Sequence, residues 1–282
     1  MVYVPFKFFS KNIQGRDFVV GDIHGCFSAL ENLLAQVNFN PEYDRVFSVG
    51  DLIDRGSESH RVIEFLNYPW FFAISGNHER MLLEAGASAA LKANWMDYNG
   101  GAWWANVPES LQPRIRQVLA QLPLVIEIAT DVGKVGIVHA DIPTGMPWSY
   151  FIQQIAHETE IVEYALWSRH RFKHLQTTGR TVPVSGIDLV IFGHTPVQRV
   201  LQTANIYYVD TGAAFKEDGF GKLTLLQIQP ELQIHQIDNN QTAELHHPTE
   251  RSTSGEHSSN TARHRILSFR YFTNLWSINK AR

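Results

Sequence analysis

Short apolar runs recur along the chain, and each ends abruptly in a glycine or a polar residue. The clearest runs are residues 17–21, 45–50, 71–76, 135–139 and 188–193. Each is rich in β-branched or aromatic side chains and is too short for an independent helix, so the pattern predicts buried strands. Between the first two runs, residues 30–37 place apolar side chains at the i, i+3, i+4, i+7 spacing of an amphipathic helix.

The alternation of strands and helices predicts an α/β fold. A second helix is expected at residues 62–66, and residues 79–122 are expected to be mainly helical, with breaks at Pro108 and Pro113 and a turn at residues 100–101. Three later runs predict further strands, forming a second sheet packed on the first. These runs are residues 206–209, 223–228 and 232–237.

Composition narrows the class of protein. The 282 residues contain 44% hydrophobic side chains and carry a net charge of −4, so no global charge points to nucleic acid or to an anionic membrane. Cys26 is the only cysteine, which fits a reducing compartment. Because the sequence has neither a signal-peptide pattern nor an apolar stretch of about 20 residues, we expect a cytoplasmic protein without membrane insertion.

The composition changes near residue 238. Residues 239–282 hold six basic and three acidic side chains in a polar segment without periodicity, followed by an aromatic and basic end. We therefore expect a folded domain at residues 1–238 and a disordered tail at 239–282. The aromatic end could instead dock on a partner or a membrane surface, and the histidines of the tail are interpreted as solvated.

Polar side chains follow five of the predicted strands. The segments are GDIHG (21–25), GDLIDRG (50–56), GNHE (76–79), VHAD (138–141) and GHTP (193–196). Taken singly, each is explained by a turn, a helix cap or a surface ion pair. Independent turns would not choose a possible metal ligand every time, and ligands of α/β proteins bind beyond the carboxyl ends of the strands. We therefore expect these segments to meet at one edge of one sheet and to form a metal site.

The ligand types restrict the metal. Carboxylate, imidazole and amide oxygen without thiolate favour manganese, iron or zinc over a thiolate-bound structural zinc. The six candidates are too many for one ion with an open position, and they suit two ions that share a carboxylate. They are Asp22, His24, Asp51, Asn77, His139 and His194.

These motifs, in this order, resemble the metal-dependent phosphoprotein phosphatases of the calcineurin-like metallophosphoesterase superfamily, and most of all the bacteriophage lambda type. The resemblance covers residues 15–228 and includes NGGAWW (99–104), WSR (167–169) and VDTGAAF (209–215). It implies a β-sandwich flanked by helices in αββα layers. It also implies hydrolysis of phosphoserine and phosphothreonine, with phosphotyrosine and small phosphoesters as further substrates, by in-line attack of a hydroxide bridging two divalent ions, with manganese expected and iron or zinc as alternatives.

The resemblance also implies a role for each matching residue. Asp22 and His24 would bind the first ion, Asp51 would bridge both, and the second ion would take Asn77, His139 and His194. His78 would be the general acid, oriented by Asp54. Arg55 and Arg169 would hold phosphate oxygens, although Arg171 and Arg180 are close enough in sequence to compete with Arg169 for that role.

Five further residues have modest interpretations. Cys26 is expected to be a packed side chain without a redox role. Asp141 and Asp210 could orient a ligand histidine or belong to plain turns. Trp103, like its neighbour Trp104, is expected to cover the core rather than to bind substrate.

Two other functions compete with phosphoprotein hydrolysis. Relatives with the same metal motifs hydrolyse dinucleoside polyphosphates or RNA 5′ ends, but the symmetrical tetraphosphate hydrolases typically depart from Asp-Arg-Gly and Gly-His-Thr-Pro, which this chain keeps. A catalytically silent scaffold is disfavoured because every candidate ligand and the candidate acid are present. The expected partners are thus phosphorylated proteins or peptides, without nucleic acid, and the oligomeric state stays open.

Overall fold

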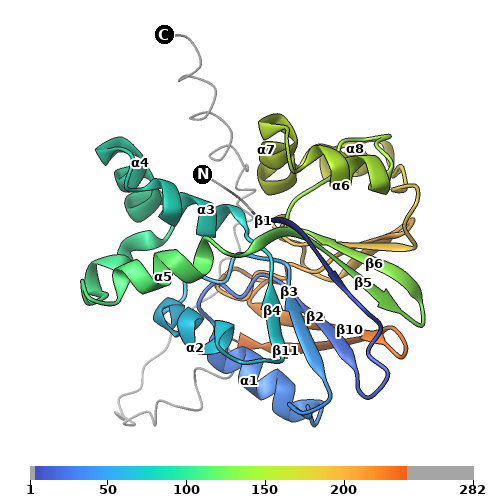
Figure 1. Cartoon of the computed structure of the whole chain (residues 1–282), viewed down its shortest axis with the longest axis horizontal. Coiled ribbons are helices and arrows are strands. Elements are labelled where there is room, and N and C mark those ends of the chain that lie inside the picture. Colours follow the sequence, from blue (N-terminus) through green and yellow to red (C-terminus); the bar gives the residue numbers. More distant parts are fainter. Residues whose placement is uncertain (1–3, 240–282) are drawn as a thin grey trace, which may run out of the picture. The chain divides into compact units, whose positions relative to one another are not determined.

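A computed structural model describes residues 4–239, which form two β-sheets flanked by helices (Figure 1). The predicted tail, residues 239–282, lies outside the described residues except for Asn239. Within the described part of the chain, no helix has both the length and the apolar character that crossing a membrane requires.

The first sheet has six strands and mixed directions. In sheet order, they are β1 (Val4–Phe9), β5 (Pro123–Thr130), β6 (Gly133–Val138), β7 (Leu189–Phe192), β9 (Ile206–Tyr208) and β8 (Leu201–Thr203). β6 and β7 run parallel, and Val138 pairs with Phe192. The residues that follow these two strands, His139 and Gly193, are therefore neighbours.

The second sheet has five strands. In sheet order, they are β11 (Gln233–Asp238), β10 (Lys222–Gln229), β2 (Asp17–Val20), β3 (Arg45–Ser48) and β4 (Phe71–Ala73). β2, β3 and β4 are parallel, with Val20 paired to Ser48 and Ser48 paired to Ala73. Their carboxyl ends are therefore level, and the three loops that follow them lie at one edge.

The two sheets pack face to face. One buried cluster joins Val19, Phe47 and Leu226 of the second sheet to Ile137 and Ile191 of the first. The opposite faces are buried under helices, so that all four residues of β2 are buried. Burial on both faces explains why this strand is a continuous apolar run rather than an alternating one.

Helices cover both outer faces and complete the αββα layers that the sequence predicted (Figure 1). Those associated with the second sheet are α1 (Phe27–Gln36), α2 (Val62–Leu66), α3 (Asn77–Glu84), α4 (Ala89–Ala93) and α5 (Gln112–Leu119), with the 3-10 turns η1 (Ser59–Arg61) and η3 (Gly101–Asn106) and the π turn η2 (Asn94–Tyr98). Those on the first sheet are α6 (Trp148–Gln154), α7 (Thr159–Trp167) and α8 (His170–Thr178).

Two sequence interpretations were wrong in detail. The polar strand ends do not share one sheet: β2, β3 and β4 belong to the second sheet, whereas β6 and β7 belong to the first. Pro113 does not break a helix, because it occupies the first turn of α5, where the missing N–H costs nothing.

Candidate metal centre and active site

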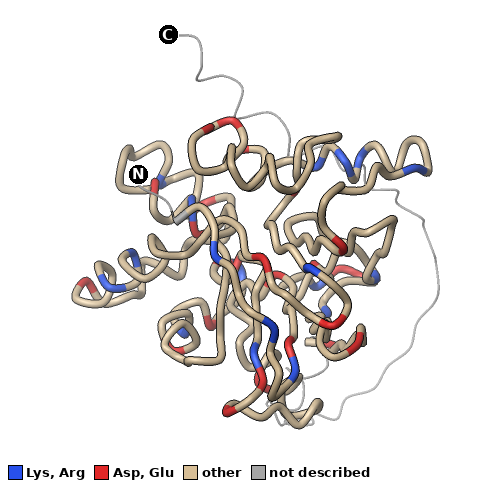
Figure 2. Tube along the Cα trace, turned by 45° about the vertical axis from the view of Figure 1, so that its right-hand side comes forward, with Lys and Arg blue, Asp and Glu red and all other residues tan. Residues whose placement is uncertain are grey.

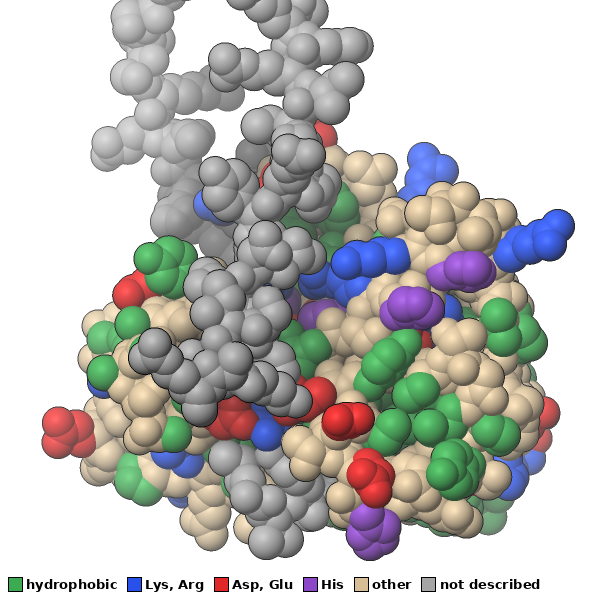
Figure 3. All heavy atoms as spheres, turned by 90° about the horizontal axis from the view of Figure 1, so that it is seen from above, with side chains coloured by type: hydrophobic (Ala, Val, Ile, Leu, Met, Phe, Trp, Pro, Cys, Tyr) green, Lys and Arg blue, Asp and Glu red, His purple; other side chains and the backbone are tan. Residues whose placement is uncertain are grey.

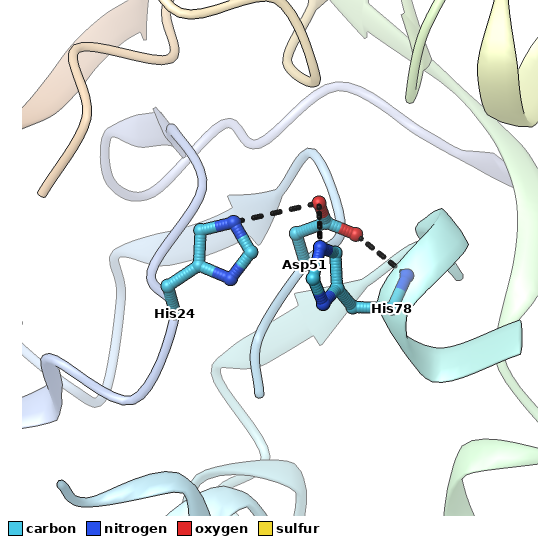
Figure 4. A group of neighbouring side chains, drawn as sticks. All are labelled: His24, Asp51 and His78. Atoms are coloured by element: carbon cyan, nitrogen blue, oxygen red, sulfur yellow. Dashed lines mark hydrogen bonds and ion pairs between the residues drawn. The ribbon is translucent and has the colours of Figure 1, made fainter. Parts of the chain in front are cut away.

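Asp51, in the loop that follows β3, is the residue around which the candidate ligands gather. Its carboxylate lies 3.5 Å from His24 Nε2, 3.3 Å from His139 Nε2 and 3.8 Å from His78 Nε2. Figure 4 shows the imidazoles of His24 and His78 turned toward this carboxylate. Asp51 is 2% exposed, so these contacts are made away from solvent.

Among residues 4–239, two groups of side chains could each hold a cation, and both include Asp51. One joins Asp51 to His24 and His78, and the other joins it to His139 and His194. Asn77 belongs beside the second group, since its Oδ1 lies 2.8 Å from His139 Nε2 and 2.9 Å from His194 Nδ1. The geometry thus brings a shared carboxylate between two sets of ligand atoms.

Backbone carbonyls fix the orientation of three of the four histidines. His24 Nδ1 lies 2.9 Å from the carbonyl of Ile53, and His139 Nδ1 lies 2.8 Å from that of Val49. His194 Nε2 lies 3.2 Å from the carbonyl of Trp167. Each carbonyl takes the ring N–H, which leaves the lone pair of the other nitrogen facing the site, as in metal-binding histidines.

Buried carboxylates add negative charge to the same place. Both oxygens of Asp22 accept the backbone N–H of His194, at 3.2 and 3.0 Å. Burial, followed by repulsion from Asp210 and Asp51, raises the pKa of Asp22 well above its usual value. Burial also lowers the pKa values of His24 and His194 and keeps these rings neutral. Clustered carboxylates and neutral imidazoles fit divalent cations, which would relieve the repulsion.

His78 differs from the other three histidines, because a carboxylate rather than a carbonyl holds its inner nitrogen. Its Nδ1 lies 2.7 Å from Asp54 Oδ2, and Asp54 is 0% exposed. Its Nε2 faces the site, 3.2 Å from Arg55 Nη2. An imidazole whose Nδ1–H is fixed by a carboxylate is suited to proton transfer at Nε2.

Two arginines approach the site, Arg55 from the loop after β3 and Arg169 from the link between α7 and α8. Arg55 Nη1 contacts His24, and its guanidinium lies 5.2 Å from the Phe215 ring centroid. Arg169 Nη2 donates to the carbonyl of His194 at 3.1 Å, while its Nε is buried and has no hydrogen-bond partner among the described residues. An unused N–H at this position is available to an anion.

Arg171 and Arg180 do not compete for that role. Arg171 is buried and bound to Asp141 through Nε at 2.9 Å, and Arg180 is exposed. Asp141 therefore orients an arginine and not a ligand histidine. Asp210 accepts the N–H of Gly212 at 2.9 Å, which is a turn contact.

The sequence reasoning missed how Glu79 supports the site. Its carboxylate, 0% exposed, accepts the backbone N–H groups of Asp51, Leu52 and Gly76 at 2.8 to 2.9 Å. It therefore fixes the loop after β3 from the first turn of α3. Its position three residues after a glycine at a helix start was a signal for such a contact.

The comparisons with known proteins agree with this geometry. The sequence profile of the family described as calcineurin-like phosphoesterase matches residues 18–198. Serine/threonine-protein phosphatase 2 of Salmonella typhimurium is 40% identical over 200 residues, which are 70% of this chain and 87% of that protein. A symmetrical bis(5′-nucleosyl)-tetraphosphatase of Actinobacillus pleuropneumoniae is 47% identical over 68 residues, which are 23% of this chain and 25% of that protein.

A solved structure described as a candidate diadenosine tetraphosphatase shares the fold. It is 23% identical, has a TM-score of 0.60, and the match covers 83% of this chain and 98% of that one. The fold and the profile match confirm the resemblance seen in the motifs. The chain belongs to the calcineurin-like phosphoesterase family and is a metal-dependent phosphoester hydrolase.

Proposed function

We propose that this protein is a phosphomonoesterase acting on phosphoserine and phosphothreonine in proteins, with phosphotyrosine and small phosphoesters as further substrates. The observation that carries the proposal is the His78–Asp54 pair, whose imidazole lies beside Asp51, the carboxylate that both groups of candidate ligands share. The name of the Salmonella relative, which matches 70% of this chain, supports the same substrate class.

The residues would divide the work as follows. Two divalent ions, manganese by preference, would be held by Asp22, His24 and the four other candidate ligands, and would stabilise the phosphoryl oxygens and activate water. Arg55 and Arg169 would bind phosphate oxygens and orient the ester. His78 Nε2 would donate its proton to the leaving alkoxide, while Asp54 keeps the other ring N–H in place.

Surface charge supports an anionic substrate. Figure 3 shows Lys, Arg and His side chains gathered over the part of the upper face where α6 to α8 lie. α8 exposes His170, Lys173 and His174, and Arg169 directly precedes it. Elsewhere basic and acidic positions are interspersed along the trace (Figure 2). This mixture of charges favours phosphoproteins over nucleic acid as partners. The location proposed for the protein is the cytoplasm.

The test is His78→Asn, assayed on phosphopeptides with added manganese. Loss of a general acid typically lowers turnover by about 10²–10⁴-fold. We expect a loss in this range with metal content unchanged by elemental analysis. Full turnover in this variant would exclude His78 as the acid, and absence of any phosphate release by the parent protein would exclude the function.

Dinucleoside polyphosphates are the second candidate substrates, favoured by the 68-residue match to the tetraphosphatase. A comparison of kcat/KM for a phosphoserine peptide, a phosphotyrosine peptide and diadenosine tetraphosphate, with defined metals, separates the two. Release of ADP much faster than release of phosphate from the peptides would reverse our assignment.

A further inference from the structure

Asp54 is held by more than its histidine. Its Oδ2 accepts the indole N–H of Trp95 at 2.7 Å in addition to His78, and its Oδ1 accepts the indole N–H of Trp103 at 2.6 Å. The N–H of Asp54 meets the hydroxyl of Ser59 at 2.9 Å. Two neutral donors thus fix the plane of a carboxylate that is 0% exposed.

Both tryptophans come from one short segment, residues 94–106, made of η2 and η3. The turn between them also holds the catalytic loop, because the carbonyl of Gly100 accepts the N–H of Arg55 at 3.2 Å. Gly101 lies flat on the indole of Trp95, where an added Cβ would come within 2.5 Å of the ring. The segment therefore forms hydrogen bonds with both Asp54 and Arg55.

Asp54 and Arg55 have backbone conformations that require stabilising contacts of this kind. Asp54 and Arg55 are consecutive non-glycine residues with φ of 75° and 67°, in the left-handed region. A backbone of this kind persists only where surrounding contacts impose it, and it concentrates at functional sites. The tryptophans and Gly100 supply those contacts.

We propose that residues 94–106 are a clamp that positions the proton donor: Trp95 and Trp103 orient the Asp54 carboxylate, and through it the ring of His78, toward the leaving oxygen. The two tryptophans are positioning residues, since their indole N–H groups donate to Asp54, which itself holds His78. This inference rests on the proposed acid role of His78. It differs from a packing role because it assigns the effect to the indole N–H and not to the ring.

The leaving group makes the inference testable. The alkoxide of phosphoserine needs a proton as it departs, whereas the phenolate of 2,4-dinitrophenyl phosphate does not. Trp103→Phe and Trp95→Phe, made separately, keep an aromatic ring and remove the donor. Each is expected to lower kcat on a phosphoserine peptide roughly 10- to 100-fold, the size of a lost hydrogen bond to a charged group, with little change on dinitrophenyl phosphate.

Trp104→Phe is the matched control. The ring centroid of this third tryptophan lies 5.9 Å from that of Trp95 and 5.5 Å from that of Trp103, and the guanidinium of Arg116 lies over its ring. It therefore shares the packing of the other two tryptophans without their hydrogen bonds to Asp54. It should leave the ratio of the two substrates unchanged. Combining His78→Asn with Trp103→Phe should cost no more than His78→Asn alone, because the tryptophan acts through the histidine.

Each outcome decides the matter. Three results would show that the tryptophans act only by packing. They are equal losses of kcat on both substrates, an equal effect of Trp104→Phe, and additive losses in the double variant. If His78→Asn selectively impairs the phosphoserine peptide and neither tryptophan variant does, the clamp fails while the proposed function survives. If His78→Asn shows no leaving-group dependence, the acid assignment and the clamp both fail.

Discussion

Replacing Arg171 by methionine should destabilise the protein strongly, although Arg171 is only two residues from Arg169. Its backbone N–H and Nε both donate to Asp141 at 2.9 Å, and Nη2 donates to the carbonyl of Ile142 at 2.7 Å. A further donation reaches the carbonyl of Val182. Arg171 is 3% exposed and Asp141 1%. The pair ties the end of β6 to the start of α8.

The magnitude follows from what the methionine leaves behind. Burial raises the pKa of Asp141 even with Arg171 beside it, so an unpaired charge there is unfavourable. Breaking a buried pair by removing one partner typically costs about 3–5 kcal/mol. At about 2–4 °C per kcal/mol for a domain of this size, Tm should fall by about 6–20 °C. Adding Asp141→Asn should recover part of the loss, because it removes the uncompensated charge.

The structural role of Arg171 is tested against the substrate-binding role of Arg169 by two measurements. They are thermal unfolding followed by circular dichroism and kinetics on a phosphopeptide. Arg169→Met should move Tm little, since that side chain makes one hydrogen bond to a carbonyl, but should lower kcat/KM roughly 10- to 100-fold through lost contacts with phosphate. An unchanged Tm for Arg171→Met, or a larger drop for Arg169→Met, would refute the division of roles between the two arginines.

Three further predictions concern other parts of the chain. In Gly76→Ala the new Cβ would lie 2.2 Å from Asp51 Oδ1, so manganese affinity measured by titration calorimetry should fall about 10- to 100-fold, while Gly86→Ala, with nothing within 4 Å, should leave it unchanged. Burial raises the pKa of Cys26 to about 12, so the native thiol should react with Ellman's reagent about a thousandfold more slowly than in guanidinium. Truncation after Asn239 should leave turnover of a small phosphoester unchanged; a large drop would contradict the proposed domain boundary.

Sequence periodicity and strand-end chemistry were enough to predict which residues the fold brings together at the candidate site. The runs before Asp22, Asp51 and Asn77 are strands β2, β3 and β4, and their parallel register brings the three residues together, as a parallel α/β sheet requires. His139 and His194 follow β6 and β7 in the same way. Each of these signals is local, because an apolar run and the polar residue that ends it are adjacent in the chain.

What the sequence did not reveal depends on contacts between distant segments. The sequence of a strand does not show which sheet the strand joins. One sheet was therefore expected to supply the candidate ligands, whereas strands of two sheets do so. Trp103 was correctly expected to pack on the core, yet its N–H is aimed at Asp54, 49 residues away. Asp141 could not be paired with Arg171 in advance, because three nearby arginines offered the same chemistry. Hydrogen-bond partners across the fold become visible only with coordinates.

Backbone strain is concentrated in the loops that carry the candidate ligands. Five of the seven non-glycine residues with positive φ in residues 4–239 belong to the site: His24, Asp51, Asp54, Arg55 and His194. Each such residue costs on the order of 1–3 kcal/mol unless its surroundings impose the conformation. The loops after β2 and β3 impose it on each other, since the N–H of His24 donates to the carbonyl of Asp51 at 2.8 Å and the N–H of Gly56 donates to that of His24 at 2.9 Å. Hydrogen bonds between the two loops therefore hold the strained backbone in place, and the cost of ordering the loops falls on folding.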